Sequence, residues 1–200
     1  MTAIIGIKQN KKIILLSDGA MSVGNYKQTD DSCKIYELTH SAGCYISGTG
    51  LRLGFDYIRD QKDVFPKNSD TLTYSMMVTK VVPAMFASFR KANFLKPGKK
   101  GETLPVSLIV MTKKRLFSVM DNGAVVEINE GFVCLGSGSQ TSFTALKLLE
   151  GRYDNVTDWG IAAIQEAIKY TPTVDYPIYY QFNDDPQLYW ITDPNKKTKS

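Results

Sequence analysis

The 200-residue sequence has few of the residues that build metal centres and disulfide frameworks. Its three cysteines, Cys33, Cys44 and Cys134, lie far apart and form no CxxC pair. This pattern argues against a structural zinc site and a disulfide scaffold, so we expect free thiols, no metal and no cofactor. The single histidine, His40, is the only candidate base for a Ser-His-Asp triad. It lies in a polar turn, where a solvated histidine is the expected interpretation.

Long apolar runs and strongly basic segments are also absent. No run approaches the roughly 20 apolar residues that span a bilayer. Polar residues interrupt the N-terminal segment by Lys8, so we expect no secretory leader. The net charge is only +4, and no basic stripe with interleaved aromatic residues is visible. We therefore expect a cytoplasmic protein that binds neither membranes nor nucleic acid.

Two further sequence patterns could indicate a ligand site, but each also has an ordinary structural explanation. The segment GSGS at 136–139 could cradle a phosphate at a helix N-terminus. However, neither GxxxxGK[ST] nor GxGxxG is present, and GTGLRLG at 48–54 has the wrong spacing, which disfavours nucleotide binding. The adjacent carboxylates at 30–31 and at 184–185 could suggest a cation site, but paired loop carboxylates are usually solvated.

Short apolar runs rich in Ile and Val mark the expected strands. The first two runs are almost continuously hydrophobic, which is typical of strands that are covered on both faces. The triplet Asp121-Asn122-Gly123 predicts a tight hairpin between two later strands. The expected strands comprise residues 3–8, 12–17, 34–38, 43–47, 106–111, 115–120, 124–128, 132–136, about 178–183 and about 187–192.

Apolar residues at helical spacing predict four helices. The first lies within 50–62, and Ser69 or Asp70 is expected to cap the second, in which Pro83 predicts a kink or a split. Two more follow the last of the central strands. The segment 95–105 is expected to be an exposed connection. The apolar stripes of the first, third and fourth helices are Leu51, Phe55 and Ile58; Phe143, Leu146 and Leu149; and Ile161, Ile164 and Ile168.

The elements therefore come in groups, in the order strands, helices, strands, helices, strands. Grouped runs argue against a parallel βαβ sheet and favour an α+β fold, with antiparallel sheets and helices packed outside them. The length fits one domain over 1–200, in which 193–200 form a flexible tail.

Thr2 is the most informative candidate for chemistry. A threonine hydroxyl is a poor nucleophile near neutral pH and needs a nearby base. Removal of Met1 turns the Thr2 nitrogen into an α-amine, whose ordinary pKa of about 7.7–8.0 leaves a useful neutral fraction near pH 7. Nucleophile and base then belong to one residue, which explains how an enzyme could work with almost no histidine. The alternative is that Thr2 only begins a strand.

Several segments, in their order and spacing, resemble the proteasome β-subunit family of N-terminal-nucleophile (Ntn) hydrolases. The resemblance is greatest to the bacterial proteasome-like subunit that works with a ring ATPase. It implies a four-layer αββα sandwich with two antiparallel sheets between helix layers. The stretch 51–131 matches in element order only. The matching segments are TAIIGI…IILLSDG (2–19), CKIYEL (33–38), YISGTG (45–50), CLGSGSQ (134–140) and, more loosely, VDYPIYYQ (174–181).

The resemblance assigns roles to three residues near the N-terminus. Thr2 falls at the nucleophile, and Asp18 and Lys34 fall at the acid and base positions that support it. A lysine beside an α-amine meets like charge, which favours its neutral form, while Asp18 would hold and orient it. Lys34 can serve either as a base or as a fixed positive charge, and a surface ion pair with Asp18 is the structural alternative.

The later motifs extend the predicted site. Gly48 falls where the family donates a backbone N–H to the oxyanion, since glycine allows close approach of the main chain. Ser137 falls where a hydroxyl bonds the nucleophile's amine, with Ser139 as a second candidate. Asp175 falls at the acid that holds this serine and the amine. Three residues further the family often has another serine, but this chain has Ile178.

The resemblance implies a threonine-type endopeptidase that hydrolyses peptide bonds of peptides or unfolded proteins. By position, Met21 and Ile46 are expected to line its specificity pocket. A homo-oligomeric ring with an ATPase unfoldase partner is implied by analogy. Two alternatives stay open. One is a non-catalytic assembly subunit that retains Met1, and the other is an Ntn amidase acting on a small substrate.

Overall fold

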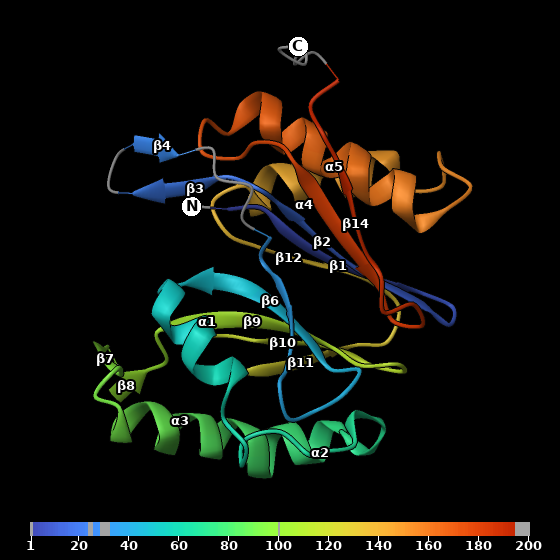
Figure 1. The fold of residues 1–200 in the computed structure, drawn as a ribbon. Helices are drawn as coiled ribbons and strands as arrows, with labels where there is room; N and C mark the ends of the chain where they lie inside the picture. The colour runs from blue at the N-terminus through green and yellow to red at the C-terminus, as the bar shows by residue number, and fades with distance from the viewer. Residues whose placement is uncertain (1, 24–25, 29–32, 100, 195–200) are drawn as a thin grey trace.

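The computed structural model describes residues 2–23, 26–28, 33–99 and 101–194, with backbone only for 21–23 and 26–28. Two five-stranded sheets face each other between layers of helices (Figure 1). The first sheet has the order β12-β1-β2-β13-β14 and the second β11-β10-β9-β6-β5, and neighbouring strands in both run antiparallel. The predicted αββα order of layers is therefore confirmed.

The strands lie close to the expected segments. In the first sheet they are β1 (Ile4–Gln9), β2 (Lys12–Asp18), β12 (Gly131–Leu135), β13 (Ile178–Phe182) and β14 (Leu188–Ile191). In the second they are β5 (Ile35–Glu37), β6 (Tyr45–Gly50), β9 (Val106–Met111), β10 (Leu116–Val119) and β11 (Val125–Ile128).

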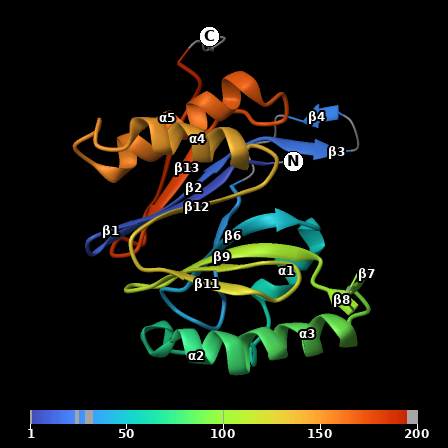
Figure 2. The same ribbon diagram turned by 180° about the vertical axis from the view of Figure 1, so that it is seen from behind.

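Helices cover the outer face of each sheet (Figures 1 and 2). The helices α4 (Ser139–Leu149) and α5 (Val156–Tyr170) lie on the first sheet. The second sheet is covered by α1 (Arg52–Arg59) and by α3 (Val82–Lys91), which continues the short α2 (Tyr74–Met76). In the described part of the chain, no helix is long and apolar enough to cross a membrane.

Three apolar layers hold this sandwich together. Adjacent residues of β1 and β2 point alternately into the space between the sheets and toward α4 and α5. Ile4 lies in the inter-sheet cluster, for example, whereas Ile5 packs on the helix side, and both are completely buried. Burial of both faces explains why these strands are almost continuously hydrophobic in sequence.

The second long helix begins differently from the expectation. Ser69 and Asp70 do not cap it, because they lie in a separate 3₁₀ turn, Ser69–Thr71. Thr73 is the cap, and its hydroxyl accepts a hydrogen bond from the N–H of Met76 at 3.2 Å. The predicted interruption at Pro83 takes the form of a π-helical turn, Met77–Val81, directly before α3. The first N–H groups of an α-helix have no acceptor within the helix, and proline has no N–H. Pro83 is therefore tolerated in the first turn of α3.

Two short hairpins were not predicted. The first joins β3 (Met21–Val23) to β4 (Tyr26–Gln28), directly after β2. The second, β7 (Lys96–Gly98) with β8 (Gly101–Thr103), lies inside the segment expected to be an exposed connection; most of the hairpin is exposed, but Leu104 and Pro105 at the end of the segment are buried. Strands of three residues carry too little periodic signal for recognition from sequence. Residues 195–200 of the predicted tail lie outside the described part of the chain.

Candidate active site

Thr2 is held at the N-terminal end of β1, where it is 5% exposed. Its N–H donates to Ser137 Oγ at 3.1 Å, and its carbonyl oxygen accepts from the N–H of Gly138 at 3.1 Å. Its hydroxyl donates to a carboxylate oxygen of Asp18 at 2.6 Å. Every polar group of Thr2 therefore has a partner, and these partners come from two distant parts of the chain.

Asp18, the last residue of β2, is the centre of the cluster. Its side chain is completely buried, and its Oδ1 accepts from Thr2 Oγ1 at 2.6 Å, from Lys34 Nζ at 2.6 Å and from the N–H of Ala3 at 2.9 Å. Its Oδ2 accepts from the N–H of Ala20 at 3.1 Å. Because a buried carboxyl group is stable only when it is hydrogen-bonded, these four donors offset the cost of burying the Asp18 side chain.

Lys34 reaches this carboxylate from the second sheet. It directly precedes β5, and its carbonyl accepts from Ser47 Oγ on β6 at 2.8 Å, which fixes the lysine backbone. Its side chain is only 14% exposed. Burial lowers the pKa of Lys34 from its ordinary value, while the charge of Asp18 and the hydrogen bond to it act in the opposite direction. Since Lys34 Nζ and Thr2 Oγ1 share one oxygen as acceptor, the two groups are neighbours.

A glycine-flanked turn between β12 and α4 holds Thr2 from the other side. Gly136 has φ of +95°, and a Cβ built on it would lie 2.1 Å from the carbonyl oxygen of Thr2. Only glycine can make this approach, and it does so in a conformation that other residues disfavour. The following residue, Ser137, is thereby brought to the Thr2 nitrogen.

Ser137, and not Ser139, is the serine that contacts Thr2. Ser139 is the first residue of α4, and its N–H donates to the carbonyl of Gly136 at 3.1 Å. A residue that the sequence reasoning missed completes this side of the cluster: Thr173 Oγ1 lies 3.1 Å from Ser137 Oγ. Its only signal was its place in the TPTV segment, two residues before Asp175.

Asp175 lies beside the cluster through its backbone. Its carbonyl oxygen accepts from the N–H of Gly19 at 3.0 Å, which joins this segment to the turn after β2. The hydroxyl next to Ser137 belongs to Thr173, so the role of the Asp175 carboxylate stays a prediction. Ile178, at the position where the family often has a serine, is completely buried and pairs with Asp18 across β13 and β2.

Gly48 lies on β6, one residue beyond the pairing of Ser47 with Ile35 of β5. Continued by one residue, the same antiparallel register places Gly48 opposite Lys34. A Cβ on Gly48 would lie 2.1 Å from the carbonyl oxygen of Ser107 on β9, so no other residue fits. The absence of a side chain is therefore required by strand packing, and the role of the Gly48 N–H as an oxyanion donor stays a prediction.

The two residues expected to line a specificity pocket are placed differently. The backbone of Met21 belongs to β3, and its side chain lies outside the described part. Ile46 is completely buried in the apolar cluster between the second sheet and its helices. Its alternation on β6 turns it toward α1, and its place in a specificity pocket stays a prediction.

Of the other candidates from the sequence, Cys33 directly precedes Lys34, whereas no contact joins His40, Cys44, Cys134 or Asp185 to this cluster in the described part of the chain. His40 lies with Nε2 3.7 Å from the carboxylate of Asp60, beyond the end of α1. All three cysteines are free thiols, as predicted, and burial raises the pKa of Cys44 and of Cys134 to about 12. Such thiols are poor nucleophiles near neutral pH. Asp185 accepts hydrogen bonds within its own turn, and residues 30–31 lie outside the described part.

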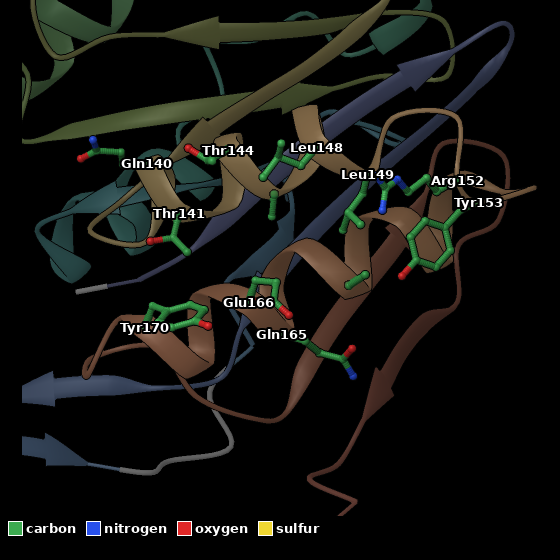
Figure 3. A pocket seen from close by; sticks show the side chains of 12 residues that line it. Gln140, Thr141, Thr144, Leu148, Leu149, Arg152, Tyr153, Gln165, Glu166 and Tyr170 are labelled. Carbon is green, nitrogen blue, oxygen red and sulfur yellow. The ribbon is translucent and has the colours of Figure 1, made fainter.

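A groove of about 750 Å³ lies elsewhere on the molecule, on the outer side of α4 and α5 (Figure 3). Polar side chains such as Thr141 and Glu166 and apolar ones such as Leu148 and Tyr170 line it. None of the residues around Thr2 contributes to it. The groove therefore belongs to the helix layer and not to the candidate active site.

Comparisons with known proteins identify a family and agree with the fold. A family model described as proteasome subunit matches residues 2–174. Among solved structures, Thiobacillus denitrificans BPH is similar with a TM-score of 0.74 and 15% identity, over 90% of this chain and 96% of that one. Eukaryotic HslV from Trypanosoma brucei has a TM-score of 0.67 and 14% identity, over 90% and 98%. The Gly-1 mutant of Anbu from Hyphomicrobium sp. strain MC1 has a TM-score of 0.72 and 12% identity, over 97% and 88%.

Proposed function

Since this chain belongs to the proteasome subunit family, we propose that it is a threonine-type peptidase whose nucleophile is Thr2 Oγ1 after removal of Met1. The fold, which is that of proteasome-like Ntn hydrolases, supports hydrolysis of peptide bonds as the reaction class. The single observation that carries the proposal is the shared acceptor. Asp18 Oδ1 lies 2.6 Å from both Thr2 Oγ1 and Lys34 Nζ.

The first half of the proposed reaction forms an ester. Thr2 Oγ1 attacks the carbonyl carbon of the scissile peptide bond, and its proton passes to the Thr2 α-amine. The backbone N–H of Gly48 stabilises the oxyanion, a contribution of roughly 3–4 kcal/mol for one such donor. The C–N bond then breaks, and the α-amine returns the proton to the leaving amine. The acyl group is left as an ester on Thr2 Oγ1.

Water completes the cycle. The neutral α-amine takes a proton from water as the water oxygen attacks the ester carbonyl. The bond between the acyl carbon and Thr2 Oγ1 breaks, and the threonine oxygen recovers the proton. The product is a carboxylic acid, and the α-amine is neutral again. No histidine is needed, because one residue supplies both nucleophile and base.

Lys34 and Asp18 support these steps in different ways. The proposed role of the Lys34 ammonium is to stabilise the developing charge on Thr2 Oγ1 as its proton leaves. Asp18 holds the ammonium in place, and burial in a low dielectric strengthens both interactions. The alternative, in which neutral Lys34 takes the Thr2 proton, predicts a different pH dependence that is set out in the Discussion.

The proposed substrates are peptides or unfolded proteins, and the proposed assembly is a homo-oligomeric ring in the cytoplasm with a ring ATPase as unfoldase partner. The helix layer supports an assembly, because it leaves large apolar side chains exposed. Phe143, Leu148, Tyr153 and Tyr170 are 49%, 68%, 41% and 73% exposed. Three of the four line the groove between α4 and α5. Large apolar side chains that stay exposed along a groove are typical of protein interfaces.

Intact mass and peptide hydrolysis together test the proposal. The chain made in its native host should lack one methionine and hydrolyse fluorogenic peptides. Thr2→Ala should lose turnover and keep the circular-dichroism spectrum, while Thr2→Ser keeps a hydroxyl and should retain part of the activity. Full activity in Thr2→Ala would disprove the mechanism. A chain that retains Met1 and is inactive would indicate the non-catalytic assembly subunit.

A small-molecule probe separates the remaining alternative. One solved structure similar to this chain is Thiobacillus denitrificans BPH in complex with epoxomicin. The processed chain should gain the mass of one epoxomicin, and Thr2→Ala should not. An enzyme that hydrolyses small amides as a monomer, and neither cleaves peptides nor binds this compound, would instead be the small-substrate Ntn amidase.

A further inference from the structure

We propose that Thr173 is a positioning residue that keeps the Ser137 hydroxyl oriented as a hydrogen-bond acceptor for the Thr2 nitrogen; the inference rests on the function proposed above. Its starting point is a chain of three polar groups. The Thr2 N–H donates to Ser137 Oγ at 3.1 Å, and Thr173 Oγ1 lies 3.1 Å from the same oxygen. Thr173 contacts neither the nucleophile nor, in the proposed reaction, the substrate.

The backbone around Thr173 is fixed on both sides. The N–H of Val174 donates to the carbonyl of Thr171 at 3.0 Å, and the Val174 side chain is 1% exposed in the core beside α5. The Asp175 carbonyl binds the N–H of Gly19 at 3.0 Å. These anchors place Thr173 beside Ser137 without help from the hydrogen bond between the two hydroxyls.

Val174 also packs against the turn that carries Ser137. A Cβ on Gly138 would lie 2.9 Å from a methyl group of Val174 and 2.9 Å from Ala3 Cβ. The segment 173–174, the turn 136–138 and the start of β1 thus form one packed unit. The position of the Thr173 hydroxyl relative to Thr2 is therefore a property of the fold and not of a loose loop.

The chemistry of the proposed reaction requires one orientation of the Ser137 hydroxyl. The lone pair of the α-amine must face Thr2 Oγ1 to take its proton. If Ser137 donated its proton to the amine, it would occupy that lone pair and block the base. A hydroxyl has one proton and two acceptor lone pairs. With Thr173 Oγ1 as an acceptor at 3.1 Å, Ser137 can direct its proton away and accept an N–H from the amine.

A second acceptor for the Ser137 proton exists but is poorer. The carbonyl oxygen of Thr2 lies 3.4 Å from Ser137 Oγ, longer than an ordinary O–H···O bond. That carbonyl already accepts the N–H of Gly138 at 3.1 Å. Loss of the Thr173 hydroxyl should therefore leave Ser137 free to turn toward the amine for part of the time. This weakens catalysis without altering substrate contacts.

The test compares Thr173→Val, which keeps the shape and removes the hydroxyl, with Thr173→Ser, which keeps the hydroxyl. In the processed enzyme, Thr173→Val should lower kcat about three- to tenfold, the range expected for one neutral hydrogen bond, with KM unchanged. Thr173→Ser should restore kcat to within about twofold. In a Ser137→Ala background, Thr173→Val should have no further effect, because the group it positions is gone.

The outcomes separate this inference from the proposed function. A processed wild-type chain without peptidase activity overturns the proposed function and this inference with it. An active wild type whose kcat is unchanged by Thr173→Val overturns the inference alone. An equal loss from Thr173→Val in the Ser137→Ala background also overturns it, since that loss would come from packing. Thermal unfolding of each variant shows whether the fold is retained.

Discussion

Ala3 and Asp18 hold each other by two hydrogen bonds: the N–H of Ala3 donates to Asp18 Oδ1 at 2.9 Å, and the N–H of Asp18 donates to the carbonyl of Ala3 at 3.1 Å. This pairing joins the start of β1 to the end of β2. It places the Asp18 carboxylate beside Thr2 whatever the state of the Thr2 nitrogen. The acidic side of the site is thus built by the main chain of the first hairpin.

Asp18→Asn should reduce both stability and activity. The change leaves the ammonium of Lys34 in a mostly buried position without its charge partner, and breaking a buried ion pair costs about 3–5 kcal/mol of unfolding free energy. Peptide hydrolysis should fall by at least a factor of 100, because the amide lacks the negative charge that holds Lys34 and replaces one acceptor oxygen with an NH2 donor. Urea denaturation and initial rates measure the two effects.

The matched control is Glu102→Gln, which breaks the exposed pair of Arg90 with Glu102, whose side chains are 60% and 49% exposed. Pairs of this kind contribute less than about 1 kcal/mol. A similar loss of stability in both variants would contradict the role given to burial at Asp18.

Titration of Lys34 should make both the stability and the activity of the enzyme depend on pH below 10.5. Burial lowers the pKa of Lys34 from its ordinary 10.5, against the opposing effect of Asp18. Between the lowered pKa and 10.5, the unfolded chain holds more protons at this lysine than the folded chain. Its contribution to the free energy of unfolding therefore rises with pH across that window.

Activity should fall through the same window if the ammonium is the working form. Lys34→Arg keeps a cation at every accessible pH and should move this fall in kcat/KM to higher pH. The measurement is the pH profile of kcat/KM for both enzymes. A rise in activity through the window would identify neutral Lys34 as the working form and would replace the fixed-charge role with that of a base.

Ser137 and Ser139 should respond differently to truncation. Ser137→Ala removes the acceptor for the Thr2 nitrogen and should lower kcat about five- to tenfold. Ser139→Ala leaves that contact intact and should stay within about twofold of the wild type. Steady-state kinetics on a fluorogenic peptide distinguish them. The reverse order would mean that the serine was assigned to the wrong position.

Gly136→Ala should be strongly destabilising. The added Cβ would meet the Thr2 carbonyl oxygen at 2.1 Å, in a conformation with φ of +95°. Backbone strain of about 1–2 kcal/mol adds to a clash of about 1–3 kcal/mol. Gly151 is a control, because it also has positive φ, +74°, and nothing lies within 4 Å of a Cβ there. Gly151→Ala should cost only the strain, and equal losses in denaturation would show that contact with Thr2 is unimportant.

Leu148→Glu tests the proposed assembly. Leu148 is 68% exposed on α4, so the substitution should leave the fold and its circular-dichroism spectrum unchanged. If a second copy covers the groove between α4 and α5, a buried unpaired charge there should weaken association by several kcal/mol. Sedimentation velocity should show a smaller particle than the wild type. An unchanged particle would place the assembly surface elsewhere.

The sequence was informative wherever local patterns and long-range order agreed. Burial on both faces of β1 and β2 makes the hydrophobicity of these strands continuous in sequence. The second of them, β2, ends at Asp18, where the following glycine indicates a turn. Order and spacing of the motifs then assigned Thr2 and Lys34 to one place. Structure brings both to the same carboxylate oxygen.

Other features depend on contacts that no local pattern records. Thr173 is 36 residues from Ser137 in sequence, in a connection whose path is set by the packing of Val174. The choice between Ser137 and Ser139 depends on the backbone of one turn. Ile46 was assigned by position, and strand alternation turns it into the core beneath α1. These three cases share one cause, since tertiary packing and not composition decides them.

The contacts that seat Thr2 use its nitrogen, its hydroxyl and its carbonyl oxygen, and these atoms persist when the preceding methionine is cut away. The proposed removal of Met1 therefore requires no rearrangement of these contacts. The contacts around Thr2 are already formed before the cleavage, which changes only the Thr2 nitrogen from an amide into an amine. Under the proposed function, a single aminopeptidase cleavage is therefore enough to activate a chain that is already folded.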